Sequence, residues 1–255
     1  MELSICLGLF ILGTILGSFY NVVGYRLPKG ESIVTPPSHC PNCNHRLTTL
    51  ELIPILSYLI QGGKCKNCKQ KISWYYPVFE AFCGILFVLS YISFGFSYEL
   101  ITSLTFISML IIVMVSDYHY MIISDEVLIF FGLALLIEKS LIYGISTLPM
   151  TLLNGLISFV IMFILKKFGD LIFRQESMGG GDIKLLGIFG IMLGVPNALI
   201  SIVVASFIGL PISLIAVNMK KATHVVPFGP FLSLGAIVVL LTHLDIATII
   251  NFLTW

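Results

Sequence analysis

Two aspartates, Asp117 and Asp182, stand at the edges of long apolar stretches, where an ionisable side chain is costly and therefore suggests a function. Residues 100–116 before Asp117 and residues 185–219 after Asp182 contain no Asp, Glu, Lys or Arg. Two carboxyl groups can hydrolyse an amide: one, ionised, takes a proton from water, and the other, protonated, hydrogen-bonds the scissile carbonyl. Alternatively, each aspartate caps a helix at the membrane boundary.

Three glycines and a lysine surround Asp182. Gly179, Gly180 and Gly181 carry no side chains, and glycine also permits backbone conformations that are closed to other residues. An extended substrate could therefore approach the Asp182 carboxylate closely. We expect the three glycines and Lys184 to lie near the substrate.

Four of the six cysteines form two Cys-x-x-Cys pairs, Cys40 with Cys43 and Cys65 with Cys68, in one polar segment. Four thiolates in two such pairs can close a tetrahedral zinc site. The segment has few large apolar residues, so metal binding could supply its folding free energy. The pattern predicts a structural zinc site, and disulfides are disfavoured if the segment faces a reducing compartment.

The elements that position these residues are membrane helices, since the chain is 57% hydrophobic and only 11% charged. We expect an all-α polytopic membrane protein with about eight transmembrane helices and a small cytoplasmic zinc-stapled loop domain. The predicted helices cover residues 3–25, 81–98, 100–116, from 127, 147–165, two within 185–219 split by a turn at 194–197, and from 228. The corresponding domains are a first transmembrane helix (1–25), a cytoplasmic tetra-Cys segment (26–75) and a transmembrane domain (76–255).

The basic residues give this arrangement an orientation. If residues 26–75 face the cytoplasm, every Lys and Arg except Lys139 also lies on that side, as the positive-inside rule requires. Asp117 and Asp182 then share one depth at the cytoplasmic face. Glu138 and Asp170 are expected to be surface charges. The net charge of +1 gives no sign of a nucleic acid partner, so we expect the lipid bilayer and a substrate only.

Together these motifs resemble the prepilin peptidases (type IV leader peptidases), which are GxGD-type intramembrane aspartyl proteases. The two catalytic blocks of that family resemble Asp117 with residues 121–125, and residues 179–182 with Lys184. Further blocks similar to the family follow in its order at residues 17–28, 38–43, 53–58, 65–68, 76–80 and 227–231. Ser124 stands where the family usually has proline.

The resemblance implies that Asp117 and Asp182 form the catalytic pair. It also implies that the protein is an enzyme of the bacterial cell membrane, a multi-pass protein that removes the short basic leader of type IV prepilins or pseudopilins at the cytoplasmic face. Because the cysteine pairs are intact, it further implies N-methylation of the new N-terminus with S-adenosylmethionine.

Candidates for that second site are Glu80, Gly17 and Asn21, although helix packing through small residues would also account for them. No glycine loop of the Rossmann type is present. Two other functions remain open. One is a peptidase without methyltransferase activity, in which the cysteine loop clamps the substrate. The other is a non-catalytic scaffold or cation-binding protein, which would need charges through the bilayer depth that these helices lack.

Overall fold

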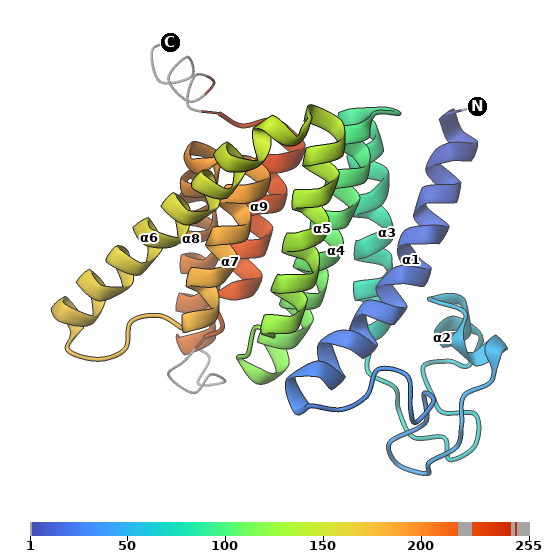
Figure 1. The fold of residues 1–255 in the computed structure, drawn as a ribbon. Helices are drawn as coiled ribbons and strands as arrows, with labels where there is room; N and C mark the ends of the chain where they lie inside the picture. Colours follow the sequence, from blue (N-terminus) through green and yellow to red (C-terminus); the bar gives the residue numbers. More distant parts are fainter. Residues whose placement is uncertain (1, 219–225, 246–247, 249–255) are drawn as a thin grey trace. The chain divides into compact units, whose positions relative to one another are not determined.

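The computed structural model describes residues 2–218, 226–245 and 248, and every long element among them is an α-helix. The chain divides into two compact units, Met1–Gly95 (unit 1) and Phe96–Trp255 (unit 2), and each is described by itself. The helices are labelled in Figure 1.

Unit 1 consists of two long helices joined by the cysteine segment. Its elements are α1 (Glu2–Arg26), the 3-10 turns Leu27–Lys29 and Thr49–Leu52, the short α2 (Leu56–Ile60) and α3 (Tyr75–Phe94). The first helix lies as predicted. The second begins already at Tyr75, because Pro77 in the first turn is compatible with a helix start, and it ends before Gly95, which has φ +62°.

Small residues bring α1 and α3 into close contact. A Cβ at Gly13 would lie 2.7 Å from the Gly84 Cα, and one at Gly17 would lie 2.8 Å from the Cys83 Cβ. No real side chain fits at such distances, so the two backbones approach closely through glycine, as is usual between membrane helices. Packing therefore accounts for Gly17.

Unit 2 is a bundle of helices that run in alternating directions (Figure 1). Its long helices among the described residues are α4 (Tyr98–Tyr120), α5 (Asp125–Tyr143), α6 (Leu148–Phe173), α7 (Gly180–Leu193), α8 (Val195–Asn218) and α9 (Gly229–Thr242). The middle of the bundle is α4, which is buried along nearly its whole length and packs against α5 and α9. The end of α4 and the starts of α7 and α9 therefore lie at the same end of unit 2.

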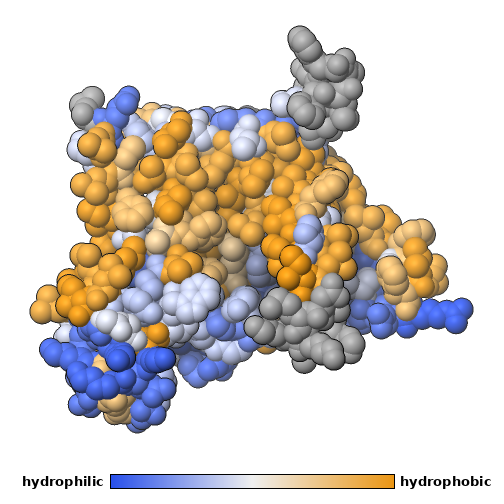
Figure 2. Space-filling view, turned by 180° about the vertical axis from the view of Figure 1, so that it is seen from behind, coloured by the Kyte–Doolittle hydropathy of each residue, from blue (hydrophilic) through white to orange (hydrophobic). Residues whose placement is uncertain are grey.

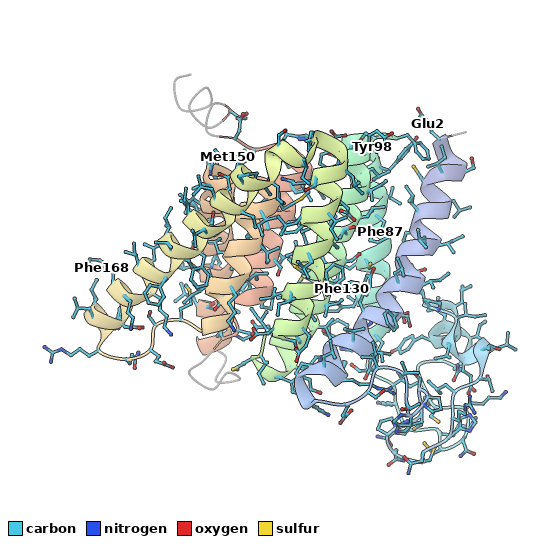
Figure 3. All side chains as sticks on the ribbon, in the orientation of Figure 1. Glu2, Phe87, Tyr98, Phe130, Met150 and Phe168 are labelled. Carbon is cyan, nitrogen blue, oxygen red and sulfur yellow. The ribbon has the colours of Figure 1, made fainter. Side chains whose placement is uncertain are left out.

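Two predicted boundaries in unit 2 differ from the structure. The third helix begins at Tyr98, because the Ser97 hydroxyl accepts the Leu100 N–H and caps it. The fifth helix continues past residue 165 to Phe173, since lysine favours helix and nothing before Arg174 interrupts it. Its added turns carry exposed apolar side chains, among them Phe168, which Figure 3 labels on this part of α6.

The predicted turn within residues 185–219 is confirmed. Gly194 has φ +80° and separates α7 from α8, which begins with Val195 and Pro196. All the predicted transmembrane helices are thus present, and five of the described helices (α1, α3, α4, α6 and α8) are long and apolar enough to cross a membrane. The chain is a multi-pass membrane protein.

Two helices of unit 2 are short for a membrane protein. Both α7 and α9 have 14 residues, a length of about 21 Å at 1.5 Å per residue. The hydrocarbon core of a bilayer is about 30 Å thick. The first turns of both helices, including Asp182 in α7, therefore need not reach the membrane surface.

The α1–α3 contact leads to a prediction about stability. Gly13→Leu should lower the free energy of unfolding by about 1–3 kcal/mol, because the new side chain meets the backbone of α3. Gly8→Leu on the same helix is the control, since nothing lies within 4 Å of a Cβ there. The measurement is thermal unfolding in detergent. Equal melting temperatures for the two variants would contradict the close packing.

Candidate active site and metal centre

The structure brings Asp117 and Asp182 to the same end of unit 2. Asp117 lies in the last turn of α4 and Asp182 in the first turn of α7. Both side chains are buried, with exposed fractions of 6% and 7%. The two carboxyl groups are close enough for Asp117 to act electrostatically on Asp182. Two buried carboxyl groups that interact do not easily both ionise, so one can be ionised while the other is protonated, as acid–base chemistry needs.

Asp117 is held by the start of a third helix. Its Oδ2 accepts the backbone N–H of Gly229 at 2.9 Å, across 112 residues of sequence. The first N–H groups of a helix have no partner within it, so this bond caps α9 from another element. Asp117 is therefore a helix cap, but for α9 and not for its own helix. A Cβ at Gly229 would lie 2.6 Å from Oδ2, so only glycine fits there.

The glycines before Asp182 matter because they have no side chains, and not because their backbone angles are unusual. Gly179 has φ −67° and ψ 148°, Gly180 and Gly181 are helical, and none of them has a positive φ. The expectation of special backbone conformations is therefore wrong. A Cβ at Gly181 would lie 2.8 Å from the Ile123 Cβ, so this glycine lets the loop after α4 pack on α7. Open space surrounds Gly180, and Gly179 lies beside the Asp182 carboxyl group.

Lys184 pairs with Asp125, a contact that sequence reasoning missed. Its Nζ lies 2.7 Å from both carboxylate oxygens of Asp125, the first residue of α5. The two side chains are about half exposed, so the pair adds about 0–1 kcal/mol at most. It nevertheless ties the first turn of α7 to the start of α5. Nothing in the sequence signals this pairing, because the partners are 59 residues apart.

Two charges at the opposite end of unit 2 are not simple surface groups. Glu138 was expected to be one, but it is half-buried and its Oε1 accepts the Thr105 hydroxyl at 2.7 Å. Lys139 donates to the carbonyls of Ile191 and Met192 at 2.8 and 2.7 Å. These carbonyls end α7 and have no partner within the helix. These bonds give a physical reason for a lysine at this end of unit 2.

Asp170 was also expected to be a surface charge, and the structure gives it a local role. Its Oδ1 accepts the backbone N–H and the hydroxyl of Ser177, at 2.7 and 2.8 Å. These bonds hold the segment that connects α6 to α7 and so leads into Gly179.

The four cysteines of unit 1 form a cluster that suits a tetrahedral metal ion. The Sγ atoms of Cys40, Cys43, Cys65 and Cys68 all lie within 4.8 Å of one another. The Cys40–Cys68 and Cys43–Cys65 sulfur pairs are 3.8 and 3.9 Å apart. A zinc ion bound at about 2.3 Å by four thiolates in a tetrahedron gives sulfur–sulfur distances of about 3.8 Å. The donor set and its spacing fit a metal such as zinc.

The two Cys-x-x-Cys turns are built alike. Each is closed by an isolated antiparallel bridge, His39 to Arg46 in the first and Lys64 to Lys71 in the second. Each also continues with a residue of positive φ directly after its second cysteine. The two turns are therefore a structural repeat, and this repetition places their sulfurs face to face.

An amide from each turn reaches a sulfur of the other. Asn42 Nδ2 lies 3.6 Å from the Cys68 Sγ, and Asn67 Nδ2 lies 3.7 Å from the Cys43 Sγ. The backbone N–H of Gln70 and the Asn42 amide lower the pKa of the Cys68 thiol from 9.0 to about 6. A thiolate is therefore available at neutral pH, and thiolates are the form that binds metal.

A second polar site of unit 1 lies between its helices and the cysteine segment. Glu80 on α3 is buried, and its Oε2 accepts the Ile55 N–H at 2.8 Å. Ile55 has φ +61° and ψ −54°, a conformation that is rare for a β-branched residue. Such outliers persist only where surrounding structure holds them, often at functional sites.

Asn21 on α1 is 3% exposed, and neither its Nδ2 nor its Oδ1 has a hydrogen-bond partner in the described structure. A buried amide without partners is costly, so each such group calls for an explanation. A ligand that supplies a donor and an acceptor would provide one.

Comparison with known proteins gives similarity along nearly the whole chain. Residues 11–94 match the family model "Bacterial Peptidase A24 N-terminal domain", and residues 104–214 match "Type IV leader peptidase family". The prepilin leader peptidase/N-methyltransferase of Bacillus subtilis (strain 168) is 40% identical over 246 residues, covering 96% of each chain. The type 4 prepilin-like proteins leader peptide-processing enzyme of Escherichia coli is 30% identical, covering 88% of this chain and 89% of the relative. No solved structure matches this chain significantly.

Proposed function

The chain belongs to the type IV leader peptidase family, and we propose that Asp117 and Asp182 are the carboxyl pair with which it cleaves its substrate. As an enzyme of this family it removes the leader peptide of type IV prepilin-like proteins and N-methylates the new N-terminus. One observation carries the assignment of the pair: two buried carboxyl groups from different helices lie close enough to interact at one end of unit 2.

The chemistry needs one of the two carboxyl groups to be ionised and the other to be protonated. The ionised group takes a proton from water, whose oxygen attacks the scissile carbonyl carbon. The protonated group hydrogen-bonds the carbonyl oxygen, and the proton taken from water passes to the leaving amine as the C–N bond breaks. Asp117 Oδ2 is occupied by the Gly229 N–H, so proton exchange on Asp117 falls to Oδ1.

The positions of the basic residues support a site at the cytoplasmic face of a bacterial cell membrane. Lys166, Arg174 and Lys184 lie at the same end of unit 2 as Asp117. Lys220 and Lys221 lie outside the described residues. A leader that precedes a hydrophobic helix would bring its scissile bond to this boundary. The open space beside Gly180 gives the substrate backbone room to approach Asp182. Gly181 and Lys184 would act by holding α7 in place.

The catalytic pair can be tested with a prepilin-type substrate in membranes. Asp117→Asn and Asp182→Asn should each lower the cleavage rate by about 10²–10⁴-fold or more, because an amide cannot exchange the proton. Glu99→Gln is the control, since Glu99 lies at the opposite end of α4. If either Asn variant cleaved at the wild-type rate while present at normal levels, that aspartate would be only a helix cap.

A second arm tests the position of Asp117 and leaves both carboxyl groups in place. Gly229→Ala places a Cβ 2.6 Å from Oδ2 and should cost about 10²-fold in rate, the effect of misplacing a reacting group by about 1 Å. Gly187→Ala in α7 is the control, because its Cβ would make only ordinary contacts at 3.5 Å or more. Equal rates for the two variants would show that the Gly229 contact does not position Asp117.

We also propose that the four-cysteine cluster holds one structural zinc ion, which would tie the two turns together and take no part in cleavage. Among residues 27–74 the only buried apolar side chains are those of Cys40 and Cys65, so the ion would supply folding free energy. Purified protein should contain one zinc per chain by elemental mass spectrometry, and Cys43→Ser and Cys68→Ser should lose it. Cys83→Ser in α3 should keep it. Full zinc content in all three variants would refute the site.

Glu80 and Asn21 are proposed for the methyl-transfer step. The group transferred comes from S-adenosylmethionine, whose sulfonium is cationic, and the acceptor is an amine that arrives as an ammonium ion. A buried carboxylate attracts both and can take the proton that the amine must lose. The partnerless amide of Asn21 supports a ligand here. Gly17 remains a packing residue.

The methyl site can be tested separately from cleavage. Asn21→Leu and Glu80→Gln should still cleave the substrate, while the mature product, weighed by mass spectrometry, lacks the methyl group. Both variants should also bind S-adenosylhomocysteine or the product peptide more weakly in calorimetry. Thr14→Val is the control, because among the described residues the Thr14 hydroxyl bonds only the Ile11 carbonyl of its own helix. Fully methylated product from both variants would exclude these residues.

A further inference from the structure

A hollow in the cysteine segment has no role in either proposed reaction. It has a volume of about 530 Å³. Its lining includes Tyr58, Gly63, Lys64, Lys71, Ser73 and Trp74. Lys64 and Lys71 face each other across the antiparallel bridge that closes the second Cys-x-x-Cys turn. Two like charges opposite each other are destabilising, so an anion between them would be stabilising.

The charge around this hollow is of one sign. Residues 52–79 contain Lys64, Lys66, Lys69 and Lys71 and no Asp or Glu. In the part of the chain that the structure describes, none of these lysines forms an ion pair. A cluster of this kind beside a membrane helix attracts anionic lipid headgroups. It would repel the two cationic ligands of the enzyme, the basic leader and S-adenosylmethionine.

Exposed apolar side chains lie on the same segment, and Ile72 and Trp74 are part of the lining itself. Trp74 is 69% exposed and directly precedes Tyr75, where α3 begins. Leu56, Leu59 and Ile60 of α2 are also exposed. Figure 1 draws α2 at the height of the lower part of α1, and in Figure 2 apolar surface lies directly above the hydrophilic loop at the left edge. Tryptophan and exposed apolar residues at a helix entry are typical of the membrane–water interface.

We propose that this hollow binds the phosphate headgroup of an anionic phospholipid and so docks the cysteine segment on the bilayer surface. Lys64 and Lys71 hold the phosphate, and Tyr58 and Ser73, which also line the hollow, supply hydroxyl groups that can donate hydrogen bonds. Trp74 and α2 contact the acyl chains. The site goes beyond the proposed function, since neither cleavage nor methylation uses these residues.

The test uses Trp74 as its own reporter. The chain has two tryptophans, so Trp255→Phe leaves Trp74 alone. The full-length protein is placed in nanodiscs of phosphatidylcholine with a fixed minor fraction of phosphatidylglycerol. Bromine quencher is carried on the acyl chains of one lipid or of the other. Per brominated molecule, phosphatidylglycerol should quench Trp74 fluorescence several-fold more than phosphatidylcholine. Equal quenching per molecule would overturn the proposal.

Paired lysine variants distinguish phosphate binding in the hollow from a non-specific effect of the positive charge of the segment. Lys64→Gln with Lys71→Gln should abolish the excess quenching, while Lys66→Gln with Lys69→Gln removes the same charge and should retain most of it. Zinc content, measured in each variant, shows that the segment is still folded. Equal losses in the two pairs would mean that the lysines act only through net charge. Loss of the excess on adding S-adenosylmethionine would assign the hollow to that cofactor. Either result overturns the lipid site.

Discussion

The hydrogen bond from the Gly229 N–H to Asp117 is the contact on which this end of unit 2 depends. A buried carboxyl group must have partners, and the start of a helix supplies unpaired N–H groups. The bond fixes where α9 begins relative to α4, and it requires glycine at position 229. Asp182 lies at the same end of unit 2, where the absence of a side chain at the preceding Gly181 lets the loop after α4 pack against α7. The contacts that join the ends of α4, α7 and α9 therefore also position the two carboxyl groups proposed for acid–base chemistry.

Most of the fold and the pairing of helix ends could be predicted, because both follow from apolar length and charge placement. Asp117 and Asp182 were expected at one end, and the structure has them there. The long-range partners of the polar side chains were not predictable. Gly229 contacts Asp117, Asp125 contacts Lys184, and the carbonyls at the end of α7 contact Lys139, each across 50 residues or more. Local patterns carry no such information, and the strained Ile55 likewise depends on Glu80.

The proposed reaction sites carry acidic side chains, whereas the proposed lipid-binding site carries basic ones. Carboxyl groups lie buried at both proposed reaction sites, at Asp117 and Asp182 in unit 2 and at Glu80 in unit 1. The lysines of the cysteine segment are exposed instead. Burying a carboxyl group strengthens its attraction for a cation, whereas an exposed lysine is screened and acts mainly by local concentration. In these proposals, buried acidic side chains carry out the two reactions, and exposed basic side chains attach the cysteine segment to the membrane surface.

The reciprocal amide–sulfur contacts of the two cysteine turns have a kinetic consequence. The side-chain amides of Asn42 and Asn67 each reach from one turn to a cysteine sulfur of the other turn. A thiolate that accepts a hydrogen bond is less basic and is protonated less readily, so a bound ion loses that ligand more slowly. Neither turn can swing away alone without breaking the contact that steadies its neighbour. Ion exchange at this centre would therefore require both turns to open together, which favours a long residence time over rapid exchange with a cellular pool.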